Sequence, residues 1–175
     1  MFSLFGRRKE KRDAALASRR KLYIPEVLYR RMINQCLEER PLEACGLLGG
    51  ASGHVTLACA TDNAERSPIL YRVDERQLIA AHREIQAAKQ EIIGIYHSHV
   101  KTDPVPSLTD IEQATFPEAF YVIVSLAHRR PVVRAWQIVD RHVTEHMVII
   151  QKEMPGAWHD LRAAVRSRTE TTDIR

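Results

Sequence analysis

The chain has 175 residues, of which 45% are hydrophobic and 27% are charged, the composition of an ordinary soluble domain that can bury a core. No apolar stretch reaches the roughly 18–20 residues that a membrane-spanning helix requires. At the start of the chain the apolar residues precede the charged ones, whereas a signal peptide has the opposite order. These features exclude helical membrane spans and predict a cytoplasmic protein.

The positive charge is concentrated near the N-terminus. Residues 1–31 carry ten Lys or Arg and three acidic residues, whereas acidic residues are in slight excess over the rest of the chain. We interpret residues 1–20 as a basic flexible arm, 21–153 as one folded domain and 154–175 as a polar tail. The arm leaves contact with nucleic acid open. The folded domain has no basic patch with interleaved aromatic residues, so nucleic-acid binding is not the leading interpretation.

Hydrophobic periodicity divides the folded domain into amphipathic helices and apolar strands. In chain order the sequence predicts a helix at 25–39, strands at 46–50, 55–60 and 69–73, a helix at 74–89, a strand at 92–99, a helix at 107–115, and strands at 119–126, 132–139 and 142–150. Asp74 is the predicted N-cap of the second helix, and Gln77 would complete a capping box. Helices combined with a mixed sheet predict an α/β or α+β fold.

Two histidines end the strand predicted at 92–99. Side chains at positions i and i+2 of a strand point to the same face, so His97 and His99 project together, about 6.6 Å apart along the chain. Two imidazoles at that separation can converge on one ion at about 2.0–2.1 Å each. A histidine at a strand end can also be an ordinary exposed side chain. A metal site needs a third ligand from elsewhere, and Asp110 is the nearest well-placed candidate.

Ser107 and Asp110 open the next predicted helix. A serine followed three residues later by an acid is typical of an N-terminal cap with a favourable charge in the first turn. This interpretation is compatible with metal binding, because a cap fixes the first turn and thereby aims Asp110 at the ion.

Glu43 lies just before a short apolar strand. It is either a solvated loop acid or the base that a catalytic metal site needs for its water molecule. Cys45 lies two residues further on, and we interpret it as a small buried residue rather than a nucleophile. Cys36, Cys45 and Cys59 are odd in number and widely spaced, which indicates free thiols.

The combined pattern resembles the JAMM (MPN+) metalloisopeptidase motif, E…H-x-H-x(7)-S-x-x-D. Glu43, His97, His99, Ser107 and Asp110 match it without a mismatch in spacing. The resemblance covers the order of elements from about residue 22 to residue 151, and the short single-domain prokaryotic members are the most similar. It implies an MPN/JAMM domain at 21–153, with a curved mixed β-sheet flanked by helices, similar to the cytidine deaminase fold.

The resemblance also implies a role for each motif residue. His97, His99 and Asp110 would bind Zn²⁺, Glu43 would act as the general base, and Ser107 would help to stabilise the oxyanion. One position departs from the pattern: many members carry proline directly after the second histidine, where this chain has Val100. The departure leaves the metal site intact and puts the geometry of the following loop in question.

JAMM enzymes similar to this chain cut after the C-terminal Gly-Gly of ubiquitin-like proteins, including bacterial sulfur-carrier proteins. The resemblance therefore implies zinc-dependent hydrolysis of a peptide or isopeptide bond after that Gly-Gly. A non-catalytic MPN scaffold, or a recruitment module that binds a ubiquitin-like protein, is the alternative. A zinc deaminase would need H-x-E and P-C-x-x-C motifs, which the sequence lacks. The sequence leaves open whether the protein forms a homodimer.

Overall fold

The computed structural model describes residues 20–152, which hold seven strands and three helices. The predicted basic arm, apart from its last residue, and the predicted polar tail lie outside the described residues. In chain order the elements are β1 (Lys21–Pro25), α2 (Glu26–Glu38), β2 (Cys45–Ala51), β3 (His54–Thr61), α3 (Glu75–Ala87), β4 (Glu91–His99), α4 (Leu108–Gln113), β5 (Phe120–Ser125), β6 (Val132–Val139) and β7 (His142–Gln151). Within the described part of the chain, no helix is long and apolar enough to cross a membrane.

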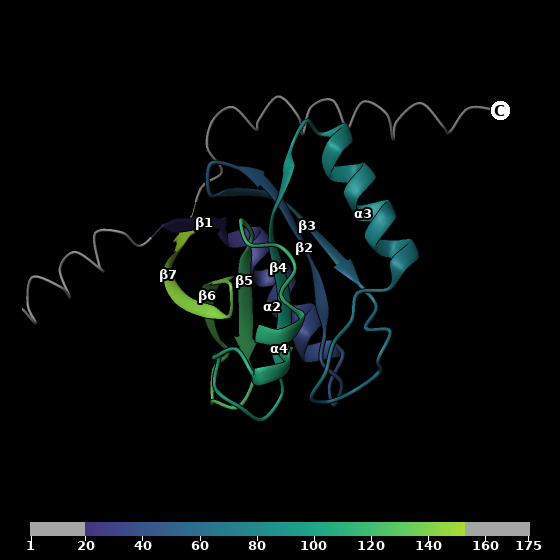
Figure 1. The fold of residues 1–175 in the computed structure, drawn as a ribbon, viewed down its shortest axis with the longest axis vertical. Coiled ribbons are helices and arrows are strands. Elements are labelled where there is room, and N and C mark those ends of the chain that lie inside the picture. Colours follow the sequence, from purple (N-terminus) through teal and green to yellow (C-terminus); the bar gives the residue numbers. More distant parts are fainter. Residues whose placement is uncertain (1–19, 153–175) are drawn as a thin grey trace, which may run out of the picture.

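The strands form one mixed sheet that curves until it closes (Figure 1). Its order is β1-β3-β2-β4-β5-β6-β7. β1 closes the barrel: it runs parallel to β7 over its whole length and meets β3 at one register pair, Tyr23 with His54. The predicted curved mixed sheet with flanking helices is confirmed. The sequence did not predict β1, because five residues directly before a helix are too few to show the alternation of apolar and polar side chains that marks a strand.

The central strand is β4, which pairs antiparallel with β2 and parallel with β5. All residues of β5, and all of β2 except its last, are buried, as expected for strands covered on both faces. This pairing sets Cys45 opposite His97 and His99 opposite Ser125. The end of β4 is thus enclosed by its two neighbours.

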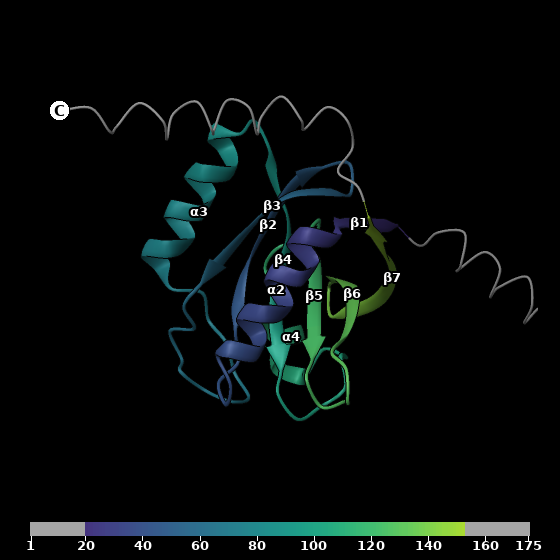
Figure 2. The ribbon, with the colours of Figure 1, turned by 180° about the vertical axis from the view of Figure 1, so that it is seen from behind.

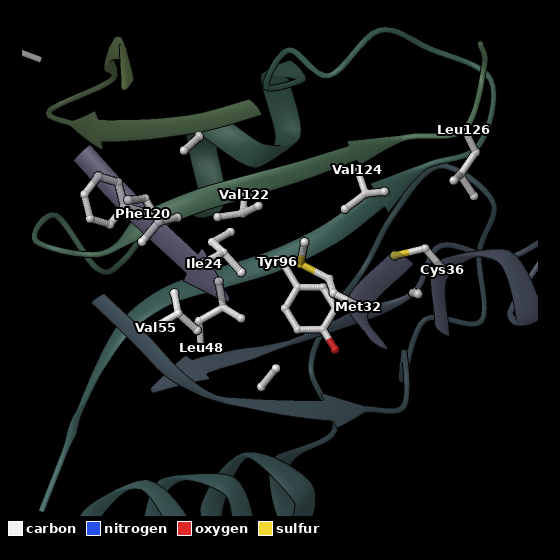
Figure 3. Packing of buried hydrophobic residues seen from close by; sticks show 14 residues of the cluster. Ile24, Met32, Cys36, Leu48, Val55, Tyr96, Phe120, Val122, Val124 and Leu126 are labelled. Carbon is white, nitrogen blue, oxygen red and sulfur yellow. The ribbon is translucent and has the colours of Figure 1, made fainter. Parts of the chain in front are cut away.

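Neighbouring residues of the central strands belong to two different apolar clusters, one on each face of the sheet. Leu48, Tyr96 and Val122 pack with Met32 and other residues on the face that α2 covers (Figure 3). The second cluster lies on the opposite face and includes Leu47, Ile95, Tyr121, Ile123, Trp136 and, from α3, Ala81 and Ile85. Figure 2 shows α2 over the middle strands and α3 to one side.

The predicted strand at 69–73 is wrong. Only an isolated bridge joins Val73 to Asn63 there, because the backbone of this segment bonds instead to the side chain of Asn63.

The predicted Asp74 cap is confirmed, since its carboxylate accepts from the N–H groups of Arg76 and Gln77. The capping box is wrong in its second half: the Gln77 side chain bonds to Asp62 instead. The other predicted elements are present, with ends shifted by at most two residues.

Candidate metal centre

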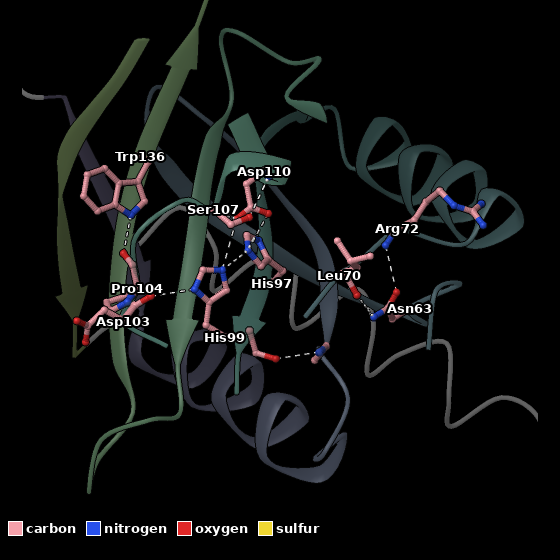
Figure 4. A network of polar contacts seen from close by, with 12 residues as sticks. Asn63, Leu70, Arg72, His97, His99, Asp103, Pro104, Ser107, Asp110 and Trp136 are labelled. Atoms are coloured by element: carbon pink, nitrogen blue, oxygen red, sulfur yellow. Dashed lines mark hydrogen bonds and ion pairs between the residues drawn. The ribbon is translucent and has the colours of Figure 1, made fainter. Parts of the chain in front are cut away.

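His97 and His99 lie at the buried end of β4, and Asp110 faces them from the first turn of α4 (Figure 4). The two histidine Nε2 atoms are 3.1 Å apart. Asp110 Oδ1 lies 3.4 Å from Nε2 of His97, and Oδ2 lies 3.4 Å from Nε2 of His99. The structure therefore brings together all three residues that the sequence suggested as metal ligands.

The spacing of these atoms suits a tetrahedral metal ion. Ligands at about 2.0–2.1 Å from a tetrahedral zinc are separated from one another by about 3.3–3.4 Å. The two Nε2 atoms are 3.1 Å apart, close to that edge length, and each lies 3.4 Å from a different oxygen of the Asp110 carboxylate. Two nitrogen donors and one carboxylate oxygen also form a common donor set for catalytic zinc, which leaves the fourth position open.

The electrostatic surroundings of the two histidines differ. The Nδ1 atom of His99 lies 2.8 Å from the carbonyl oxygen of Asp103; a carbonyl only accepts, so Nδ1 carries a hydrogen, and in the neutral ring Nε2 presents a lone pair. Burial opposes protonation of His99, but Asp110 and the Asp103 carbonyl raise the pKa of its ring above the usual value. Burial lowers the pKa of His97, so that ring is neutral. Burial opposes ionisation of Asp110, but its contacts with His97 and His99 hold its carboxyl pKa well below the usual range.

A reciprocal cap fixes the direction of Asp110. The backbone N–H of Ser107 donates to Asp110 Oδ2 at 2.7 Å, and the backbone N–H of Asp110 donates to Ser107 Oγ at 3.1 Å. The predicted N-terminal cap is confirmed, and the capping box is complete. Because Ser107 Oγ accepts in this bond, its hydroxyl hydrogen is not used by the cap.

Glu43 is 5% exposed, and the backbone beside it is tied to the histidine strand. Ala44 N–H donates to Ser98 Oγ, and Ser98 N–H donates to the Ala44 carbonyl, both at 2.9 Å. Ser98 lies between the two histidines, so this pair of bonds sets Glu43 beside them. Burial, assisted by the charge of Asp110 and opposed by that of His99, raises the pKa of Glu43 to about 7.

The cysteines take no part in this chemistry. Cys36, Cys45 and Cys59 are free and buried, as predicted. Burial raises the pKa of the Cys45 thiol to about 11, and its sulfur lies 3.4 Å from the hydroxyl oxygen of Thr61. A thiol that stays protonated near neutral pH is a poor nucleophile, which agrees with a packing role.

The loop at 100–106, which begins at Val100, is held by contacts from three later positions. Trp136 Nε1 donates to the carbonyl of Pro104 at 2.8 Å, and Ser125 Oγ donates to the carbonyl of Thr102 at 2.6 Å. His128 Nε2 lies 2.9 Å from a carboxylate oxygen of Asp103. Sequence reasoning missed these residues, because no local pattern links a loop to side chains that lie more than 20 residues away.

An aromatic-lined cavity of about 210 Å³ lies beside the centre. Tyr71 forms part of its wall and also stacks on the His97 ring, with 4.1 Å between ring centroids and 14° between planes. Phe116 and Tyr121, which follow α4 in the sequence, also line this cavity. Sequence reasoning also missed Tyr71, whose contact with His97 depends on the fold of the loop that the strand prediction misjudged.

Comparison with known proteins identifies the family. Residues 25–139 match Prok-JAB, the prokaryotic homologs of the JAB domain. The chain belongs to this family. The match covers the motif residues and the strands that carry them, so the resemblance drawn from the motif is confirmed at the level of the family and its fold.

Two named relatives and one solved structure illustrate the similarity. The chain is 37% identical over 139 residues to a CysO-cysteine peptidase of Mycobacterium tuberculosis, an alignment that covers 75% of this chain and 92% of the relative. It is 39% identical over 88 residues to a desampylase of Haloferax volcanii, covering 49% of this chain and 63% of that one. A protein from Desulfitobacterium hafniense has a similar solution structure, with a TM-score of 0.70, 28% identity, and coverage of 76% of this chain and 94% of that one.

The raised pKa of Glu43 predicts a pH-dependent effect on the stability of the metal-free protein. The folded state holds this proton up to about pH 7, whereas the unfolded chain releases it near 4.5, so Glu43 lowers stability increasingly as the pH rises between these values. We expect Glu43→Gln to raise the unfolding free energy at pH 8 by on the order of 1–3 kcal/mol and to change it little near pH 4.

Urea unfolding of chelator-treated protein, followed by circular dichroism at both pH values, measures this difference. Glu118→Gln, at an exposed position, makes the same chemical change as a control and should give no pH-dependent gain. An equal effect of Glu43→Gln at pH 4 and pH 8 would contradict a burial-raised pKa.

Proposed function

We propose that this protein is a zinc-dependent hydrolase of the peptide or isopeptide bond after the C-terminal Gly-Gly of a ubiquitin-like or sulfur-carrier protein. The observation that carries the proposal is the buried cluster of His97, His99 and Asp110 with Glu43 fixed beside it. The relatives named CysO-cysteine peptidase and desampylase support the class of reaction.

In this proposal His97, His99 and Asp110 hold Zn²⁺. Two neutral imidazoles and one carboxylate leave the ion with a net charge of +1. When bound, zinc supplies Lewis acidity, which polarises a carbonyl group and lowers the pKa of water. Asp103 has a supporting role, because its carbonyl orients the His99 ring with Nε2 toward the centre.

Glu43 is the proposed general base. Its buried carboxylate takes a proton from the attacking water and returns it to the leaving amine as the bond breaks. A base works best when its pKa lies near the working pH, and burial moves the pKa of Glu43 in that direction. A cation in the centre would shift this pKa back down and keep the carboxylate ionised at neutral pH.

Ser107 is the proposed oxyanion donor. Its hydroxyl oxygen is held at the start of α4 by the N–H of Asp110, and its hydrogen can be donated to the oxygen that becomes negative during attack. One well-placed donor of this kind contributes roughly 2.7–4 kcal/mol to transition-state stabilisation. The cap that aims Asp110 therefore also positions this hydroxyl.

The surroundings of the centre support a folded protein substrate with a narrow tail. Ile69 and Leu108 are 74% and 77% exposed, and each lies two residues from a residue at the centre, Tyr71 or Asp110. Exposed apolar side chains beside a reaction centre are typical of surfaces that bind another protein. Glycine at the cleaved position would let the substrate backbone approach the buried centre most closely.

A non-catalytic scaffold or recruitment module is the alternative. Such a protein would have no need of an ionised carboxylate and two imidazoles buried at ligand distance, because this burial costs folding free energy. The presence of all five motif residues in one place therefore favours catalysis. Roles for the basic arm and a homodimer stay predictions from the sequence.

We expect about one zinc ion per chain in protein purified without added metal. His97→Ala and Asp110→Asn each remove one of three ligands, so both variants should lose most of the metal. Elemental analysis of folded protein measures the content, with His82→Ala on the exposed face of α3 as the matched control. Full zinc retention in both ligand variants would refute the assignment of the site.

We expect cleavage directly after Gly-Gly in a fusion that carries a whole ubiquitin-like or sulfur-carrier protein. Contacts with a folded partner away from the scissile bond raise the rate only when that partner is present. A fusion with Ala-Ala in place of Gly-Gly, and the isolated tail peptide, should therefore react much more slowly. Equal rates on all three substrates, measured by mass spectrometry, would indicate a general peptidase and contradict the proposed substrate class.

A further inference from the structure

The segment of residues 62–73, called here the clasp, follows β3 and crosses beside the metal centre without forming a strand. We propose that Asn63 is a positioning residue: its amide group organises the clasp, and the clasp holds the backbone of Glu43 and the ring of Tyr71 around His97. This inference rests on the proposed function in treating Glu43 and His97 as parts of one site.

All four hydrogen-bonding positions of the Asn63 amide are in use, and Figure 4 shows the contacts with Leu70 and Arg72. Its Nδ2 atom donates to the carbonyls of Glu43 and Leu70, at 3.0 and 2.8 Å. Its Oδ1 atom accepts from the backbone N–H groups of Glu65 and Arg72, at 3.0 and 3.1 Å. An amide has two donor hydrogens and two acceptor lone pairs, so this side chain is fully satisfied by one set of backbone groups.

Only an amide of this length fits these partners. A carboxylate at position 63 would turn an oxygen toward two carbonyl oxygens and could donate to neither. It would remove the donor from the part-buried Glu43 carbonyl and from the more exposed Leu70 carbonyl, and add repulsion between oxygens. Asn63→Asp therefore removes the positioning contacts while it changes the size of the side chain very little.

Backbone bonds reinforce the link between the clasp and Glu43. The N–H of Glu43 donates to the carbonyl of Ser67 at 2.9 Å. Glu43 is therefore bonded to the clasp through both its backbone N–H and its backbone C=O, the latter through Asn63. A shift of the clasp must move the backbone that carries the proposed base.

Near its C-terminal end, the clasp places the ring of Tyr71 against His97, a proposed metal ligand. Leu70 and Arg72, which flank Tyr71, are two of the four residues whose backbone groups bond to the Asn63 amide. Tyr71 stacks on His97 with 4.1 Å between centroids. The described structure offers no hydrogen-bond partner for the buried His97 Nδ1, so ring packing, rather than a polar contact, orients this imidazole there.

The first test compares wild type, Asn63→Asp and Asn34→Asp, a control that makes the same change at an exposed position of α2. We expect Asn63→Asp to lower kcat on the Gly-Gly fusion by roughly 10- to 100-fold, because small displacements of reacting groups have effects of this size. KM should change much less, and Asn34→Asp should behave as wild type. A kcat within about twofold of wild type in folded Asn63→Asp protein would overturn the proposal.

The second test does not depend on turnover and examines the contact between Tyr71 and His97 through which the clasp is proposed to act, so it remains decisive if wild type cleaves no Gly-Gly substrate. Each protein is loaded with Co²⁺, and its visible absorption spectrum and chelator resistance are measured. Tyr71→Leu should alter the spectrum and weaken Co²⁺ retention, because the ring that orients His97 is lost. Tyr71→Phe keeps the stacking ring and should match wild type. Identical spectra and retention in Tyr71→Leu and wild type would refute the positioning role, whatever the substrate.

Discussion

The structure depends on a cluster of electron-pair donors that is largely buried. A carboxylate and imidazoles taken out of water lose hydration, and nearby lone pairs repel one another. Asp110, His97 and His99 nevertheless converge at 3.1 to 3.4 Å. In the proposed function a bound cation offsets this cost, and the same burial strengthens every electrostatic interaction with the ion.

The remainder of the fold restrains these donors from several directions. The pairing of β2 with β4 joins Ala44 to Ser98 and thereby sets Glu43 beside the histidines. The cap at Ser107 aims Asp110, and the Asp103 carbonyl selects the tautomer of His99. Each restraint uses a backbone group or a short side chain, so few rotatable bonds separate the site from the sheet. Such preorganisation means that the site does not have to rearrange during each turnover, so no free energy of reorganisation adds to the barrier.

Sequence reasoning predicted what depends on local spacing and failed where distant contacts decide. The apolar run before His97 and the Ser107 cap have strong local signals, and the structure contains both. Alternating residues at 69–73 also suggested a strand, but Asn63 offers the backbone of that segment other partners. β1 closes the barrel only because β7, more than 100 residues later, lies beside it. The supports from Trp136 and Tyr71 depend on the same long-range folding.

The central claim is that Glu43 supplies base catalysis to a metal centre that it does not itself build. Glu43→Gln replaces the carboxylate with an amide of equal shape that cannot take a proton from water. The most direct measurement determines the zinc content and kcat of this variant on one preparation with a Gly-Gly fusion. The account predicts unchanged zinc content and loss of nearly all turnover. Turnover near the wild-type rate with zinc bound would contradict it.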